Sequence, residues 1–171
     1  FPYTTLFRSV QRGVVFMPLM RSSDSEIKSD QVPSSLTTVA LSKITNAYTL
    51  NVRGVSADLA AGVAGTANVA LVSVSDSAEN ISRKMDTLQA LGSKLSGVTL
   101  TSNGSPLTLT AAQWANNLPN VAHAVLPKIT NGYSVVVSDM AAADAAGLAN
   151  NGRVTSLTVQ DSSANIAANI D

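Results

Sequence analysis

The chain has no cysteine, few aromatic residues and little charge. Aromatic side chains make up 4% of its 171 residues and charged side chains 13%. The absence of cysteine excludes disulfide bonds and thiolate metal sites, and it is compatible with a protein that folds outside the cell. The 11 basic and 11 acidic residues cancel. We expect neither nucleic acid nor an anionic membrane surface as a partner, because both favour clustered lysine and arginine.

Signatures of membrane spans and of common enzymes are also missing. No apolar run approaches the roughly 20 residues that a spanning helix needs, so we expect no membrane insertion. The sequence contains no GxSxG elbow, HExxH helix, Walker loop or GxGxxG turn. The single histidine, His123, has apolar neighbours on an expected helix, and we interpret it as a structural side chain rather than a general base. These observations indicate a protein that is not an enzyme.

Calcium-binding signatures are absent as well. The sequence has neither the glycine-rich nonapeptide repeat nor the acidic loop of an EF-hand. Its densest acidic group comprises Asp24, Glu26 and Asp30, which we interpret as part of a solvated loop. We therefore expect no cofactor, no metal site and no calcium dependence in this chain.

What the chain does contain is an internal repeat. Residues 44–86 (copy 1) align without a gap with residues 129–171 (copy 2), at an offset of 129 − 44 = 85 positions, and 17 of the 43 pairs are identical. A unit that cannot bury its own apolar face must stack on its neighbours. Neighbouring repeats of the same chain are therefore the first expected partners.

The repeat divides the chain into three parts. Residues 1–9, FPYTTLFRS, match the translation of a common sequencing adapter, so we interpret them as an artefact that is not part of the fold. The first residue is not Met, and we interpret the chain as a metagenomic fragment. Residues 10–35 are expected to be irregular or poorly joined, with a polar loop at 22–35. The repeat array is expected at 36–171, with residues 87–128 completing the 85-residue period.

Each copy is expected to alternate short strands with helices. Tyr48, Leu50 and Val52 alternate with polar residues, which predicts a strand, and the pattern recurs in copy 2. Small residues in the Ala-rich segments favour short helices that pack closely. Those helices are expected at 57–65 and 142–150, and second strands at 69–75 and 154–160.

The segment after the second strand predicts further helices. An apolar stripe at helical spacing indicates one continuous helix, and a capping box at 110–113 opens another that Pro119 breaks. A strand at 97–101 and an Asn-Gly turn at 103–106 lie between these helices. The stripe consists of Ile81, Met85, Leu88, Leu91 and Leu95.

These alternations predict an α/β fold, specifically a right-handed solenoid with short parallel strands on one face and helices on the other. Tandem β-sandwich modules are the alternative. They fit the Thr, Ser and Val content but leave the leucine stripe and the Ala-rich segments unexplained.

Three pairs of residues recur at structurally informative positions. The aspartates, or Ser77, are expected to cap the following helices, with Glu79 completing a capping box. The asparagines are expected to form a hydrogen-bond ladder between successive turns, with ligand binding as the second interpretation. The tyrosines and Trp114 are expected in the core, with carbohydrate stacking as the alternative. The pairs are Asp76 with Asp161, Asn80 with Asn165, and Tyr48 with Tyr133.

Four motifs carry a resemblance to a known group: YTLNVRGVSADLAAGVA, VSVSDSAENI, VTLTSNGSPLTLTAAQ and VSDMAAADAAGLA. Through them, residues 36–171 resemble very large secreted bacterial proteins described as beta-strand-repeat or calcium-binding-repeat proteins. The resemblance implies an extracellular or cell-surface location, type I secretion, and a role in adhesion or biofilm matrix. It leaves calcium binding open for the parent protein, whereas this fragment contains no motif for it.

The sequence therefore predicts a non-enzymatic structural or adhesive repeat fragment of a large secreted or cell-surface bacterial protein. One alternative is a ligand-recognition module whose partners are surface glycans or proteins. A weaker alternative is the passenger region of a secreted hydrolase, in which His123 would take part in catalysis.

Overall fold

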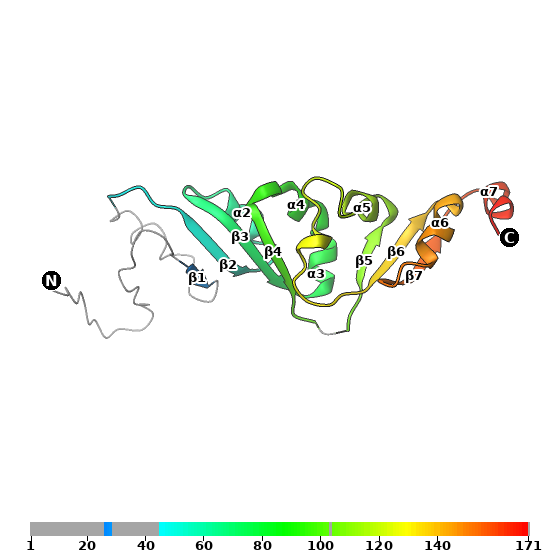
Figure 1. The fold of residues 1–171 in the computed structure, drawn as a ribbon, viewed down its shortest axis with the longest axis horizontal. Coiled ribbons are helices and arrows are strands. Elements are labelled where there is room, and N and C mark those ends of the chain that lie inside the picture. Colours follow the sequence, from blue (N-terminus) through cyan, green and yellow to red (C-terminus); the bar gives the residue numbers. More distant parts are fainter. Residues whose placement is uncertain (1–25, 29–44, 103, 171) are drawn as a thin grey trace.

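The computed structural model describes residues 26–28, 45–102 and 104–170. Within these ranges the chain is an α/β fold of parallel strands that alternate with helices. The strands follow one another in chain order along the long axis, beginning with β1 (Glu26–Lys28) (Figure 1). The helix α7 (Ser163–Ala168) lies at the opposite end of the described residues. The first residues of the expected array, 36–44, lie outside the described part.

Two sheets contain the strands of the described residues, in the orders β1-β2-β3-β4 and β5-β6-β7. Within each sheet, every strand pairs in parallel with its neighbour in sequence, and β4 and β5 do not pair. Parallel neighbours require a crossover connection, which excludes the antiparallel hairpins of the tandem β-sandwich alternative for this part of the chain. The strands are β2 (Leu50–Val55), β3 (Val69–Asp76), β4 (Leu95–Leu100), β5 (Leu107–Thr110), β6 (Val135–Met140) and β7 (Val154–Val159).

Short helices provide most of the crossovers. The Ala-rich helices were predicted correctly, and the capping box at the start of α5 is confirmed, since the Thr110 hydroxyl accepts from the Gln113 amide and the Gln113 side chain accepts from the Thr110 amide. The helices are α2 (Ala60–Ala64), α3 (Ala78–Arg83), α4 (Met85–Ala90), α5 (Ala111–Asn116) and α6 (Ala142–Ala149), with short 3-10 turns η2 (Gly92–Lys94) and η3 (Leu126–Lys128).

The two copies share one strand register. Leu50 lies opposite Val69 in copy 1, and Val135 lies opposite Val154 in copy 2, which is the same pair moved by 85 positions. Every other pair between β2 and β3 has its counterpart between β6 and β7. The sequence repeat is therefore a structural repeat.

The shared register includes a bulge near the end of the first strand. It falls between Val52 and Val55 in copy 1 and at the matching place in copy 2. Gly54 has φ 68° there, and its counterpart Asp139 has φ 59°. Most side chains resist this left-handed conformation, whereas glycine accepts it and aspartate tolerates it. The bulge is thus a built-in part of the unit.

An apolar interior runs between the strands and the helices of copy 1. Val72 from β3, Ile81 from α3 and Leu88 from α4 are fully buried. The apolar stripe was predicted as one helix, and this was wrong. The helix breaks at Lys84 (φ −104°, ψ 11°), and Leu95 begins strand β4 instead. All of the stripe is nonetheless at least partly buried, because strand and helix residues line the same interior.

The first sheet is continued past β4 by a side chain. Ile129 forms a single parallel bridge with Val98. Two residues later, the Asn131 amide group pairs with the backbone of Leu100: its oxygen accepts from the Leu100 amide at 3.0 Å, and its nitrogen donates to the Leu100 carbonyl at 2.9 Å. Asn131 thus satisfies backbone groups that another strand would otherwise pair with.

Two further expectations need correction. Residues 22–35 were predicted to be a loop, yet Glu26–Lys28 form β1, which pairs with β2. The second helix was expected to pass Trp114 and reach Pro119, but α5 ends at Asn116 and turns follow it. The Asn-Gly turn does not join a hairpin, because β4 and β5 belong to different sheets.

We predict that Asn131→Leu destabilises the fold by about 1–3 kcal/mol, because it leaves the buried backbone of Leu100 without partners. Chemical denaturation followed by circular dichroism measures the change. The matched control is Asn46→Leu, at the same position of copy 1, where the side chain is exposed. Equal effects of the two substitutions would contradict the role assigned to Asn131.

Candidate functional site

A carboxylate at the end of β3 joins two successive strand–helix segments. The Asp76 side chain accepts a hydrogen bond from the Ala57 amide, 19 residues earlier, at 2.9 Å. It also accepts from the Ser77 amide at 2.8 Å and from the Asn80 side chain at 2.7 Å. Asp76 therefore holds the turn after β2 against the start of α3.

Copy 2 repeats this arrangement. Asp161 accepts from the Ala142 amide at 3.1 Å, from the Ser162 amide at 2.8 Å and from the Asn165 side chain at 2.7 Å. The recurrence of all three bonds shows that the motif DSxxN is a structural device of the unit rather than an incidental contact.

The actual helix caps are the serines. The Ser77 hydroxyl accepts from the Asn80 amide, and Ser162 does the same for Asn165, each at 3.2 Å. The predicted ladder of asparagines between turns was wrong. The Asn80 side chain donates to Asp76 and accepts from Arg83, so its bonds stay within its own unit. The bond between successive strand–helix segments is the one from the Ala57 amide to Asp76.

These bonds shift the acidity of both aspartates. Partial burial acts to raise the pKa of Asp76, but the hydrogen bonds from Asn80, Ala57 and Ser77, with the charge of Arg83, together hold that pKa below its usual value. The pKa of Asp161 is also lowered, chiefly by Asn165 and then by the amides of copy 2. Each aspartate is therefore charged at neutral pH.

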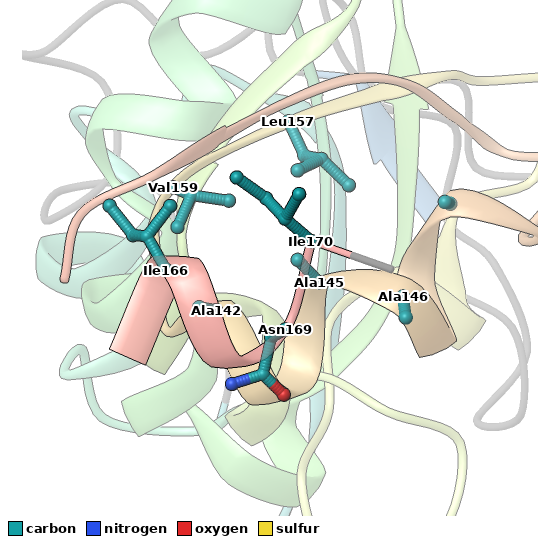
Figure 2. Close-up of a pocket in the computed structure, with 9 residues that line it drawn as sticks. Ala142, Ala145, Ala146, Leu157, Val159, Ile166, Asn169 and Ile170 are labelled. Atoms are coloured by element: carbon teal, nitrogen blue, oxygen red, sulfur yellow. The ribbon is translucent and has the colours of Figure 1, made fainter. Parts of the chain in front are cut away.

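An apolar groove lies at the end of the molecule formed by α6, β7 and α7. It has a volume of about 320 Å³. In Figure 2, Leu157, Val159, Ile166 and Ile170 gather around the opening, while the amide of Asn169 points away from it. The sequence interpretation missed this groove. The signal that could have revealed it is the identity of its alanines with those of copy 1: Ala142, Ala145, Ala146 and Ala149 match Ala57, Ala60, Ala61 and Ala64.

A second hollow, of about 270 Å³, combines aromatic and polar side chains. Trp114 and Tyr133 line it, together with Asn117 and Arg153. The Arg153 guanidinium lies 4.3 Å from the centre of the Tyr133 ring, in a cation–π contact. Trp114 is buried and Tyr133 is partly buried against the core, so the predicted core placement holds for both.

Tyr48 occupies the matching position of copy 1. It too is partly buried against the core. Its counterpart Tyr133 faces Arg153, but copy 1 has Asn68 at the position of Arg153. The two tyrosines therefore share their packing and differ in what their rings meet.

His123 does not lie on a helix, as was expected. It is an exposed turn residue with φ 64°, and its ring faces Gly92. A side chain on Gly92 would bring a Cβ to 3.4 Å from the imidazole. The ring thus lies against the glycine of η2.

Within the described residues, no group of three or more His, Asp or Glu side chains is placed to hold a metal ion. Asp24 and Asp30 of the acidic group lie outside those residues. In the same part of the chain, no helix has the length and apolar character needed to cross a membrane.

Comparisons with known proteins add no assignment. No protein-family model matches the chain, and no match is found among curated proteins or solved structures. The geometry of the chain itself must therefore carry the functional argument.

We predict that Asp76→Asn lowers the Tm at pH 7 by about 2–4 °C, the shift that roughly 1 kcal/mol produces in a chain of this size. Because the folded pKa of Asp76 is depressed, its contribution is complete above the unfolded value of about 3.9 and is lost as pH falls through the folded pKa. The Tm of the variant should therefore fall less steeply than the wild-type Tm below about pH 4. Differential scanning calorimetry between pH 2 and 7 measures both effects, and parallel acid limbs would contradict the assignment.

Proposed function

We propose that this chain is a non-enzymatic structural segment of a large secreted or cell-surface bacterial protein, folded as an α/β solenoid that provides length and a presenting surface. The observation that carries the proposal is the identical register of the two copies, bulge included. A unit that reproduces its own strand pairing can be repeated along the chain with the same geometry each time.

Bonds between successive coils support an array rather than separate modules. Asp76 reaches back to Ala57, and the Ser102 hydroxyl accepts from the Ala78 amide at 2.9 Å. The Lys128 ammonium donates to the carbonyls of Gly92 and Leu95 at 2.9 and 2.8 Å. Each of these contacts stabilises one coil only when its neighbour is folded, which is the behaviour of a one-dimensional array.

The resemblance of residues 36–171 to secreted bacterial repeat proteins supports the location and an adhesive or biofilm-matrix role. A repetitive surface suits that role, because many weak contacts accumulate into firm attachment without a single deep pocket.

The proposal predicts that length is additive. Inserting one or two extra copies of residues 44–128 between Lys128 and Ile129 should raise the maximum dimension in small-angle X-ray scattering by about 14 Å or more per copy, since each unit adds three hydrogen-bonded strand steps of about 4.8 Å besides the unpaired step from β4 to β5. A matched insert shortened by ten residues breaks the register and should not give this increment. Unequal increments from successive whole units, or a compact particle, would contradict a solenoid.

Ligand recognition is a second candidate function, and the hollow beside Trp114 and Tyr133 favours it. Aromatic rings beside amide and guanidinium groups form a surface on which a sugar can stack while its oxygens accept hydrogen bonds from the guanidinium. Tyr48, at the matching position of copy 1, does not line this hollow.

If the hollow binds glycans, an array of surface oligosaccharides should show a ligand whose affinity falls about tenfold in Tyr133→Ala, as loss of one stacking contact implies. Tyr48→Ala is the control and should leave the affinity unchanged. An array without any bound glycan, or equal losses in both variants, would remove this candidate.

A further inference from the structure

The apolar groove of copy 2 has a counterpart in copy 1 that is already filled. Moving its lining residues back by 85 positions gives positions such as Val72, Val74, Ile81 and Met85. All four are buried, with exposed fractions of 0 to 1%. The structure thus contains the same surface twice, once covered and once open.

The nearest part of the cover in copy 1 is the segment 87–100. Helix α4 packs near α2, and strand β4 pairs in parallel with β3, while β5 packs against α3. Leu88, Leu95 and Val98 of this segment are almost wholly buried. Their apolar side chains shield the alanines of α2 and the valines of β3 from water.

Exposure at matching positions measures the difference between the copies. Val74 is 1% exposed and its counterpart Val159 is 38% exposed. Met85 is fully buried, whereas Ile170 is 74% exposed. Removing an isoleucine side chain from water lowers the free energy, so burial of this surface under another segment is favourable.

The residues that line the open surface are also more alike between the two copies than the rest of the repeat. Six of its nine lining residues are identical in copy 1, compared with 17 of 43 over the whole repeat. The six are Ala142, Ala145, Ala146, Ala149, Val159 and Ile166. Identity concentrated on one face, rather than spread over the unit, indicates that both faces fit the same kind of cover.

The strand edges of the two copies differ in the same way. Strand β3 pairs with β2 on one edge and with β4 on the other, whereas β7 pairs with β6 alone among the described strands. An open strand edge offers amide and carbonyl groups to another strand. In addition, the Ala78 amide at the start of α3 donates a hydrogen bond to the hydroxyl of Ser102 in the next coil. The residue that corresponds to Ala78 at the start of α7 is Ser163.

We propose that this groove is the docking surface for one further helix–strand coil of the same repeat type, joined in cis behind α7. The coil must carry an amphipathic helix with a leucine at the position of Leu88, then a parallel strand with apolar residues at the positions of Leu95 and Val98. A serine in the place of Ser102 completes it by accepting from the Ser163 amide. The inference rests on the proposed solenoid and names the chemistry of its next member.

The test appends a copy of Thr87–Ser102 directly after Asp171 of the full chain. Asp171 aligns with Asp86, so the appended segment enters at the spacing of copy 1. The Tm should rise by about 4 °C or more, and the amides of α6 and β7 should exchange with deuterium at least tenfold more slowly. In the matched control, the appended leucines corresponding to Leu88 and Leu95 are replaced by aspartate, and neither effect should appear. Ile166→Asp in the groove should cancel the protection given by the unmodified appendage.

Three results would overturn the inference. The first is an appended chain whose α6 and β7 exchange as fast as in the parent, and the second is equal protection by the aspartate control, which would indicate a non-specific tail. The third is a parent chain that is dimeric by light scattering and becomes monomeric in Ile166→Asp, because the groove would then bind a second copy. Additive length in the scattering experiment with no protection here would retain the solenoid and reject only this docking surface.

Discussion

Burial of apolar surface between successive strand–helix segments is the constraint on which the described structure depends. Val72 and Ile81 are fully buried, and so are Leu88 and, nearly, Leu95 in the segment 87–100 that follows them; β4 pairs with β3, and β5 also packs on α3. Polar contacts such as that from the Ala57 amide to Asp76 then fix how one coil sits on the next, since a misplaced coil would leave a carboxylate without its donors. Hydrophobic burial thus provides the drive for stacking, and the aspartates provide its alignment.

Much of the fold follows from the repeat in the sequence. Two strands and an Ala-rich helix per copy were predicted close to their observed positions, because a pattern found twice is less ambiguous than one found once. Asp76 was also recognised as a structural residue. Its reach to Ala57 could not be predicted, because the residues are 19 positions apart and only the stacking of β2 on β3 brings them together. Asn80 was wrongly assigned to contacts between units, because its actual partner, Asp76, lies only four residues away in the same unit.

The remaining errors arose where local backbone geometry overrides periodicity. Leu95 falls at helical spacing after Leu91, yet Gly92 adopts φ 61° between them and the chain turns from helix to strand. His123 likewise has a positive φ, and this turn removes it from the helix that its apolar neighbours suggested. The apolar groove could not be located from composition, because its residues are ordinary core residues in copy 1. They form a surface in copy 2 because no described strand pairs with the far edge of β7.

The stacking direction determines how the molecule responds to mechanical load. Because neighbouring strands succeed one another along the long axis (Figure 1), a pull along that axis acts on the hydrogen bonds between strands along their own direction. In the solenoid that we propose, coils would therefore separate one after another rather than slide past one another in a single shear event. Such an array would lengthen in small steps under tension and act as a compliant tether rather than a rigid strut.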